Sequence, residues 1–207
     1  IDKALLEKHH EGLIISSACL GGEISQKIMA GNIEGAEAAA LWYKNLVGDD
    51  YYLEVMRHPA ADPKQRAEIF DNQELCNKEI LRMGEKLGIK VIATNDVHFL
   101  NEEDAEAHDL LICLNTRKDI DDPNRMRYTR QEWFKTTAEM MELFKDMPQV
   151  IENTSEVADK VEEYKLDSDP IMPVFPIPAS CGTEEEYRQK FSDEDLFNEF
   201  TRNEKGE

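Results

Sequence analysis

Three short apolar runs, separated by longer segments with helical periodicity, constrain the fold of this chain more than any other feature. The runs lie at residues 13–18, 51–56 and 89–94, and each is short enough to form a buried strand. Between them, apolar spacing predicts two helices across residues 23–47 and a further helix from Pro63 to Gly88. Strands that alternate with helices in this way are typical of an α/β fold with parallel strands.

The later part of the chain predicts mainly helices and an extended segment. A short strand is expected at 133–135, and helices are expected at 102–115, 138–145, 148–161 and about 184–200. Four prolines fall within residues 169–178. Because proline fixes φ and has no N–H to donate, this stretch is expected to be an extended linker.

The charge balance limits what this chain can bind on its own. Lys and Arg number 24 against 44 Asp and Glu, which gives a net charge of −20. Such a surface repels phosphate backbones, so we expect little direct binding of DNA or RNA. No apolar run approaches the roughly 20 residues that span a bilayer, so we expect no membrane contact. The four cysteines form no Cys-x-x-Cys pair, which favours a reduced, cytoplasmic compartment.

Polar side chains with useful chemistry follow all three predicted strands. Cys19 follows the first strand, Arg57 and His58 follow the second, and Asp96 and His98 follow the third. In parallel α/β folds the carboxyl ends of the strands are where functional groups gather.

These residues have two interpretations each. Asp96 and His98, two apart in an extended segment, offer an oxygen and a nitrogen ligand to a divalent metal, and Cys19 offers a thiolate. Arg57 and His58 suit a phosphate or a supporting position. The alternatives are a capping aspartate, a loop histidine, a small buried cysteine and an ordinary hydrogen-bonded loop pair. The sequence contains no Gly-x-Gly-x-x-Gly, P-loop or Gly-x-Ser-x-Gly motif, so nucleotide-binding and serine-hydrolase readings have no motif support.

Several segments, taken in order, resemble a known family. They are Ser-Ser-Ala-Cys-Leu-Gly-Gly at 16–22, Ala-Thr-Asn-Asp-Val-His-Phe-Leu at 93–100, and the stretches at 11–15, 39–43, 52–54, 103–109, 121–127 and 172–178. As a set they resemble the alpha subunits of bacterial DNA polymerase III, the C-family replicative polymerases. The resemblance implies the later part of a polymerase-and-histidinol-phosphatase (PHP) domain, a distorted parallel (βα) barrel, followed by a helical segment and a Pro-rich linker.

The resemblance also implies chemistry and partners. In family members with an intact metal cluster, the positions of Cys19, Asp96 and His98 are ligands for Zn, Mn or Fe, and the cluster supports phosphoester hydrolysis as a 3′–5′ exonuclease. The complete polymerase uses Mg, DNA and deoxynucleotides, and it works with clamp, proofreading and clamp-loader subunits. The earlier PHP ligands and the palm carboxylates of the polymerase are not found in this sequence.

We therefore expect a segment of a replicative polymerase with three parts: PHP sequence at 1–125, a helical junction at 126–168, and the linker with the start of the polymerase core at 169–207. The non-Met first residue, Ile1, fits that expectation. Two alternatives stay open. One is a stand-alone PHP-type phosphoesterase, and the other is a non-catalytic scaffold that docks a replicase partner through the acidic C-terminal part.

Overall fold

The computed structural model describes residues 1–173, 178, 180 and 182–201, and it divides the chain into two compact units. The first unit is Ile1–Glu162 and the second is Glu163–Glu207. Residues 161–173 have no regular secondary structure, whereas Pro176 and Cys181 lie outside the described residues.

A small parallel sheet forms the centre of the first unit. Its strands are β1 (Ile15–Ser16), β2 (Tyr51–Val55) and β3 (Val91–Ala93), in the order β1-β2-β3. Ile15 pairs with Tyr51, and Leu53 pairs with Val91. All five residues of β2 are buried, as expected for the middle strand of a parallel sheet covered on both faces. The predicted α/β fold with parallel strands is confirmed, although the strands are shorter than the apolar runs.

Helices connect these strands as the sequence predicts. The elements of this first half are α1 (Lys3–His9), α2 (Glu23–Met29), α3 (Ile33–Val47), η1 (Gly48–Asp50), α4 (Pro63–Gln65), the π-helical turn η2 (Arg66–Phe70) and α5 (Asp71–Leu87). The predicted break between α2 and α3 is confirmed, and Asn32 begins α3 by accepting a hydrogen bond from the Gly35 N–H. Gly88 ends α5 at a φ of 62°, a left-handed conformation that glycine adopts without a Cβ clash.

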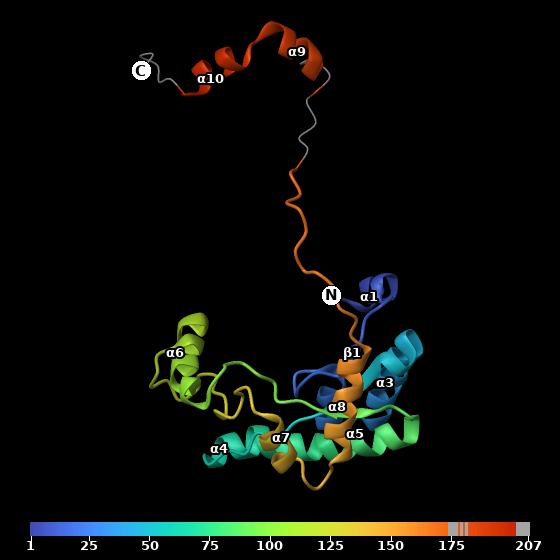
Figure 1. Ribbon diagram of the computed structural model, residues 1–207. Coiled ribbons are helices and arrows are strands. Elements are labelled where there is room, and N and C mark those ends of the chain that lie inside the picture. The colour runs from blue at the N-terminus through green and yellow to red at the C-terminus, as the bar shows by residue number, and fades with distance from the viewer. Residues whose placement is uncertain (174–177, 179, 181, 202–207) are drawn as a thin grey trace. The chain divides into compact units, whose positions relative to one another are not determined.

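The core lies between the sheet and the helices that cover it. Many of the most deeply buried apolar side chains come from β2, α3 and α5, and they include Ala40, Leu53, Val55, Ile80 and Met83. α8 (Gln149–Lys160) packs against β3, where the Asn153 side-chain amide donates to the Val91 carbonyl at 2.7 Å. Figure 1 shows α8 and α5 beside the sheet region. The edge of β3 is therefore covered by a helix, which protects it from pairing with another chain.

The remaining elements of the first unit are η3 (Glu102–Asp104), α6 (Ala105–Thr116) and α7 (Thr137–Leu143). The helix predicted at 102–115 is confirmed as η3 followed by α6, and those predicted at 138–145 and 148–161 are confirmed as α7 and α8. The predicted strand at 133–135 is wrong, because Trp133 makes only an isolated bridge with Phe99. Lys135 instead turns back, and its N–H donates to the Trp133 carbonyl.

The second unit contains α9 (Glu184–Lys190) and α10 (Asp193–Thr201). A single helix over 184–200 is predicted, and the structure shows two. The Ser192 N–H and hydroxyl both donate to the Asp195 carboxylate, and the Asp195 N–H donates back to the Ser192 hydroxyl. This reciprocal cap starts a new helix and thereby ends the continuity of the first. Throughout the described part of the chain, every helix is too short or too polar to cross a membrane.

Candidate functional site

The carboxyl ends of the strands surround a cavity of about 160 Å³. Three of the five predicted site residues line it, namely Cys19, His58 and Asp96. The opposite wall comes from the segment that follows α6, with Met126, Arg127, Tyr128 and Glu132. The parallel topology explains the meeting of residues from three strands, because their carboxyl ends share one edge of the sheet.

Cys19 lies in a tight turn after β1 that requires a glycine. A Cβ at Gly22 would stand 2.3 Å from the Ser17 carbonyl oxygen, far closer than real atoms approach. Ala18, just before Cys19, has a φ of 63°, an uncommon conformation for a residue with a side chain. The turn closes through the Gly22 N–H, which donates to the Cys19 carbonyl at 2.9 Å.

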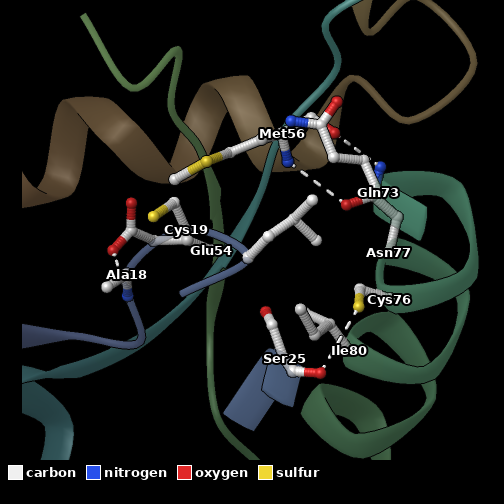
Figure 2. Close-up of a pocket in the computed structure, with 10 residues that line it drawn as sticks. Ala18, Cys19, Ser25, Glu54, Met56, Gln73, Cys76, Asn77 and Ile80 are labelled. Carbon is white, nitrogen blue, oxygen red and sulfur yellow. Dashed lines mark hydrogen bonds between the residues drawn. The ribbon is translucent and has the colours of Figure 1, made fainter. Parts of the chain in front are cut away.

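A buried carboxylate on β2 stabilises this turn. Glu54 is 8% exposed, and its carboxylate accepts hydrogen bonds from the Ala18 N–H and the Thr94 hydroxyl, both at 2.7 Å. Figure 2 shows the Glu54 side chain next to Cys19, with the bond to Ala18 drawn. Glu54 thus joins the turn after β1 to the end of β3. In the sequence, Glu54 is noted only within the stretch 52–54 that resembles the polymerase family. A single acidic residue in an apolar run does not indicate which groups its carboxylate will bind.

Asp96 and His98 diverge from the arrangement that the sequence predicts. Asp96 lines the cavity with a φ of 44°, another left-handed residue with a side chain. His98 is exposed and is not among the cavity-lining residues. Its Nδ1 donates to the Asp96 carbonyl at 2.5 Å, and its Nε2 accepts from the Tyr128 hydroxyl at 3.1 Å. Both ring nitrogens of His98 are therefore engaged within the chain.

His58 is a neutral, buried histidine at the base of the cavity. It is 2% exposed; its Nδ1 accepts from the Gln73 amide at 2.9 Å, and its Nε2 donates to the Asn95 carbonyl at 3.0 Å. Burial lowers the pKa of His58 below its ordinary value, because the charged form loses its hydration. The Gln73 carbonyl in turn accepts from the His58 backbone N–H.

Glu132 is a cavity residue that the sequence analysis does not identify. It is 1% exposed, and its Oε1 accepts from the Thr129 N–H and hydroxyl and lies 3.6 Å from His58 Nδ1. Its Oε2 is buried and has no hydrogen-bond partner among the described residues. No local pattern signals this residue, since a glutamate in a polar loop is ordinarily solvated.

Arg57 points to carboxylates of its own chain. Its guanidinium contacts Glu74 on α5 at 2.8 Å and Asp146 beyond α7, and it donates to the Leu143 carbonyl at 3.0 Å. The bond to Asp146 is the main cause of the raised pKa of Arg57. A phosphate at this position would have to displace two carboxylates. The structure thus gives Arg57 a packing role, and its assignment to phosphate stays a prediction.

The wall opposite the strands is held by a charged pair that joins two of the resembling segments. Arg125 donates to both oxygens of Asp109 on α6, at 2.6 and 2.7 Å, and these side chains are only 5% and 14% exposed. The bidentate bond to Arg125 lowers the pKa of Asp109. Arg125 also donates to the Ile120 carbonyl, so one guanidinium fixes the loop that carries Tyr128 to the cavity.

The predicted metal ligands do not form a metal centre by themselves. Among residues 1–173, 178, 180 and 182–201, no three His, Cys, Asp or Glu side chains converge closely enough to hold an ion. Cys19 and Asp96 share a cavity, whereas His98 has both nitrogens engaged. The donor set in this conformation does not fit a metal, and the assignment of these three residues as ligands stays a prediction.

Comparison with known proteins agrees with the fold. The model of the PHP domain matches residues 1–58, which include β1, β2 and the turn that carries Cys19. This match agrees with a partial α/β fold of the PHP type.

The relatives narrow this class further. The chain is 38% identical to the DNA polymerase III subunit alpha of Borreliella burgdorferi over 198 residues, which is 95% of this chain and 16% of that protein. It is 42% identical over 171 residues to the corresponding protein of Campylobacter jejuni, covering 77% of this chain and 13% of the relative. The same protein of Treponema pallidum is 32% identical over 189 residues, covering 90% and 15%. This chain is homologous to one segment of the bacterial DNA polymerase III alpha subunits and spans about a sixth of their length.

Proposed function

We propose that this chain is a segment of a bacterial replicative DNA polymerase and acts within the alpha subunit during template-directed DNA synthesis. The observation that carries the proposal is the 38% identity across 95% of the chain with a DNA polymerase III alpha subunit. Nucleotidyl transfer, with Mg, DNA and deoxynucleotides, is assigned to the remainder of the subunit. The clamp, proofreading and clamp-loader subunits are its expected partners in the cytoplasm.

The charges of this chain support that division of labour. A net charge of −20 opposes contact with a phosphate backbone, so DNA binding falls to other parts of the polymerase. The described residues supply instead a small α/β unit with a cavity at the strand ends.

Primer extension tests the proposal directly. The full-length alpha subunit that contains this segment is expected to extend a primed template in the presence of Mg²⁺, whereas the 207-residue chain alone is expected to remain at the level of a blank. Extension by the isolated chain would contradict the proposal, as would a full-length subunit that is folded and inactive on every primed template.

A second candidate function is phosphoester hydrolysis of the PHP type, which is favoured by the match of residues 1–58 to the PHP domain. Cys19, Asp96 and the buried Glu132 line the cavity, although the described residues do not form a metal centre in this conformation. Protein purified without chelator would be assayed for bound Zn, Mn and Fe and for nucleotide release from a 3′ end, with Asp96→Asn/His98→Ala as the matched variant. Bound metal and nucleotide release, both lost in the variant, would support hydrolysis. Absence of both would contradict hydrolysis.

A further inference from the structure

α6 carries two apolar stripes, and the residues of the first unit, Ile1–Glu162, cover only one of them. Ala105, Ile112 and Cys113 are buried, and His108 stacks near Phe99 and Tyr128. A second stripe consists of Ala107, Leu110, Leu111 and Leu114, which follow the i, i+3, i+4, i+7 spacing of a packed helix face. Its three leucines are 54%, 55% and 74% exposed. We name these four residues the α6 stripe.

A helix that is apolar on opposite sides is normally buried on both. Single exposed leucines occur on most proteins, whereas four apolar positions in register on one helix mark a contact surface. Within Ile1–Glu162, α6 stands apart from the helices that cover the sheet (Figure 1). The bidentate Asp109–Arg125 pair joins this helix to the loop that follows it, on the side away from the α6 stripe.

We propose that the α6 stripe is covered by another part of the same alpha-subunit polypeptide, which presents an apolar surface to it. This inference rests on the proposed function, in which the chain is one segment of a much longer protein. Its relatives extend well beyond the matched region, which is 13–16% of their length in the examples above, and thus provide ample chain to supply the covering surface.

The small area of the α6 stripe and the net charge of the chain favour a covering segment of the same polypeptide over a separate protein or a second copy. Three leucines expose far less than the roughly 800 Å² per partner that separate proteins bury in a stable association. A tethered segment needs less area, because its effective concentration is high. A second copy of this chain would bring a further −20 of charge against the first, which disfavours self-association.

Hydrogen–deuterium exchange of the amides in α6 tests the proposal. Exchange would be compared in the 207-residue chain and in the full-length alpha subunit, each as wild type and as Leu111→Asn/Leu114→Asn. In the wild type we expect slower exchange in the full-length protein by about tenfold or more, because burial of a leucine shifts an opening equilibrium by at least that factor. The double substitution is expected to remove this difference, and the isolated variant is the reference for the loss of helix propensity that asparagine causes in α6.

Leu75→Asn is the matched control, since Leu75 on α5 is a single leucine with 48% exposure. It is expected to leave α6 exchange unaltered in both proteins. Equal α6 exchange in the two wild-type proteins would overturn the proposal. So would protection of the isolated chain that rises with its concentration, which would identify a second copy, or protection of the full-length protein only when another replicase subunit is added.

Primer extension by the same full-length preparations separates this proposal from the proposed function. Slower α6 exchange in a subunit that fails to extend primers would support the covered surface and contradict the polymerase assignment. Normal primer extension by a subunit whose α6 amides are unprotected would support the polymerase assignment and contradict the covered surface.

Discussion

At the scale of single residues, the cavity depends on buried polar groups that satisfy one another. Glu54 accepts from the backbone of the Cys19 turn and from Thr94, and His58 exchanges hydrogen bonds with Gln73 and donates to the Asn95 carbonyl. Such groups stabilise the fold only while each partner is present, because a buried donor without an acceptor has lost its hydrogen bonds to water and gains no other bond in return. Substitutions here are therefore informative in pairs that differ only in hydrogen bonding.

The first prediction concerns Glu54. Glu54→Ala removes the acceptor of the Ala18 N–H and the Thr94 hydroxyl, and we expect it to lower the free energy of unfolding by about 1–3 kcal/mol for a donor left unpaired. Glu54→Gln retains an oxygen for Ala18, and its amide can donate to Thr94, so we expect a smaller loss. Urea denaturation of both variants measures the difference. Glu152→Ala, at an exposed position on α8, serves as the control, and equal stability of the two Glu54 variants would refute this role.

The second prediction concerns the pH dependence of stability through His58. Burial lowers its pKa in the folded chain, so the unfolded chain binds a proton more readily. Stability from this group is therefore complete above the unfolded pKa of about 6.5 and declines as the pH falls below it, until the folded pKa is reached. The slope contributed by one proton is at most about 1.4 kcal/mol per pH unit.

Denaturation between pH 5 and 8 measures that slope. His58→Gln is expected to flatten it, because the group that gains a proton on unfolding is gone. His9→Gln, at an exposed position on α1, is the matched control and should preserve the wild-type profile. An unchanged profile in the His58 variant would assign the pH dependence to other groups.

At the scale of elements, the close packing of α5 on the sheet requires a glycine within a helix. A Cβ at Gly84 would lie 2.6 Å from Val91 Cγ2 and 2.9 Å from the Ile89 carbonyl oxygen. Alanine is otherwise the better helix former by about 1 kcal/mol. α5 therefore contains glycine at position 84, despite its low helix propensity, because a larger residue would prevent the close contact between α5 and β3.

The third prediction follows from that contact. Gly84→Ala is expected to destabilise the chain by roughly 1–3 kcal/mol, since overpacking a tight core outweighs the gain in helix propensity. Removing the γ-carbons of Val91 should relieve part of the strain, so the double variant with Val91→Ala is expected to be more stable than the two single effects predict when added. Stabilisation by Gly84→Ala alone would show that α5 shifts away from β3 without loss.

At the scale of the whole chain, the two units are joined through exposed backbone. All residues from 161 to 173 are exposed and lack regular structure, whereas Ile1–Glu162 contains the sheet and the described core. Backbone without burial or regular hydrogen bonding is where proteases cut first.

The fourth prediction is a defined proteolytic product. Brief trypsin treatment of the 207-residue chain is expected to cleave after Lys165 well before it cleaves after Lys78 or Arg82 in α5, and mass spectrometry identifies the product. The released fragment 1–165 should retain the unfolding transition of the intact chain. Simultaneous cleavage at all three positions would indicate that the first unit is not independently stable.

Elements whose determinants lie within a few residues can be predicted from the sequence. The break between α2 and α3, the end of α5 at Gly88 and the three strands were predicted, because caps, glycines and apolar spacing act over a few residues. The strand at 133–135 and the single helix at 184–200 were wrong. Residues 133–135 form only the single bridge between Trp133 and Phe99, which is too little pairing for a strand. The helix is divided by the cap between Ser192 and Asp195.

The sequence by itself determined the α/β order, the position of Cys19, His58 and Asp96 at strand ends, and the resemblance to replicative polymerases. Only the tertiary structure decided that Glu132 faces the same cavity as these residues, that Tyr128 donates to His98, and that Arg57 is paired with Glu74 and Asp146. The physical reason is range. Propensity and capping depend on neighbours along the chain, whereas the partner of a buried polar side chain is set by segments tens of residues away that only the packed fold brings together.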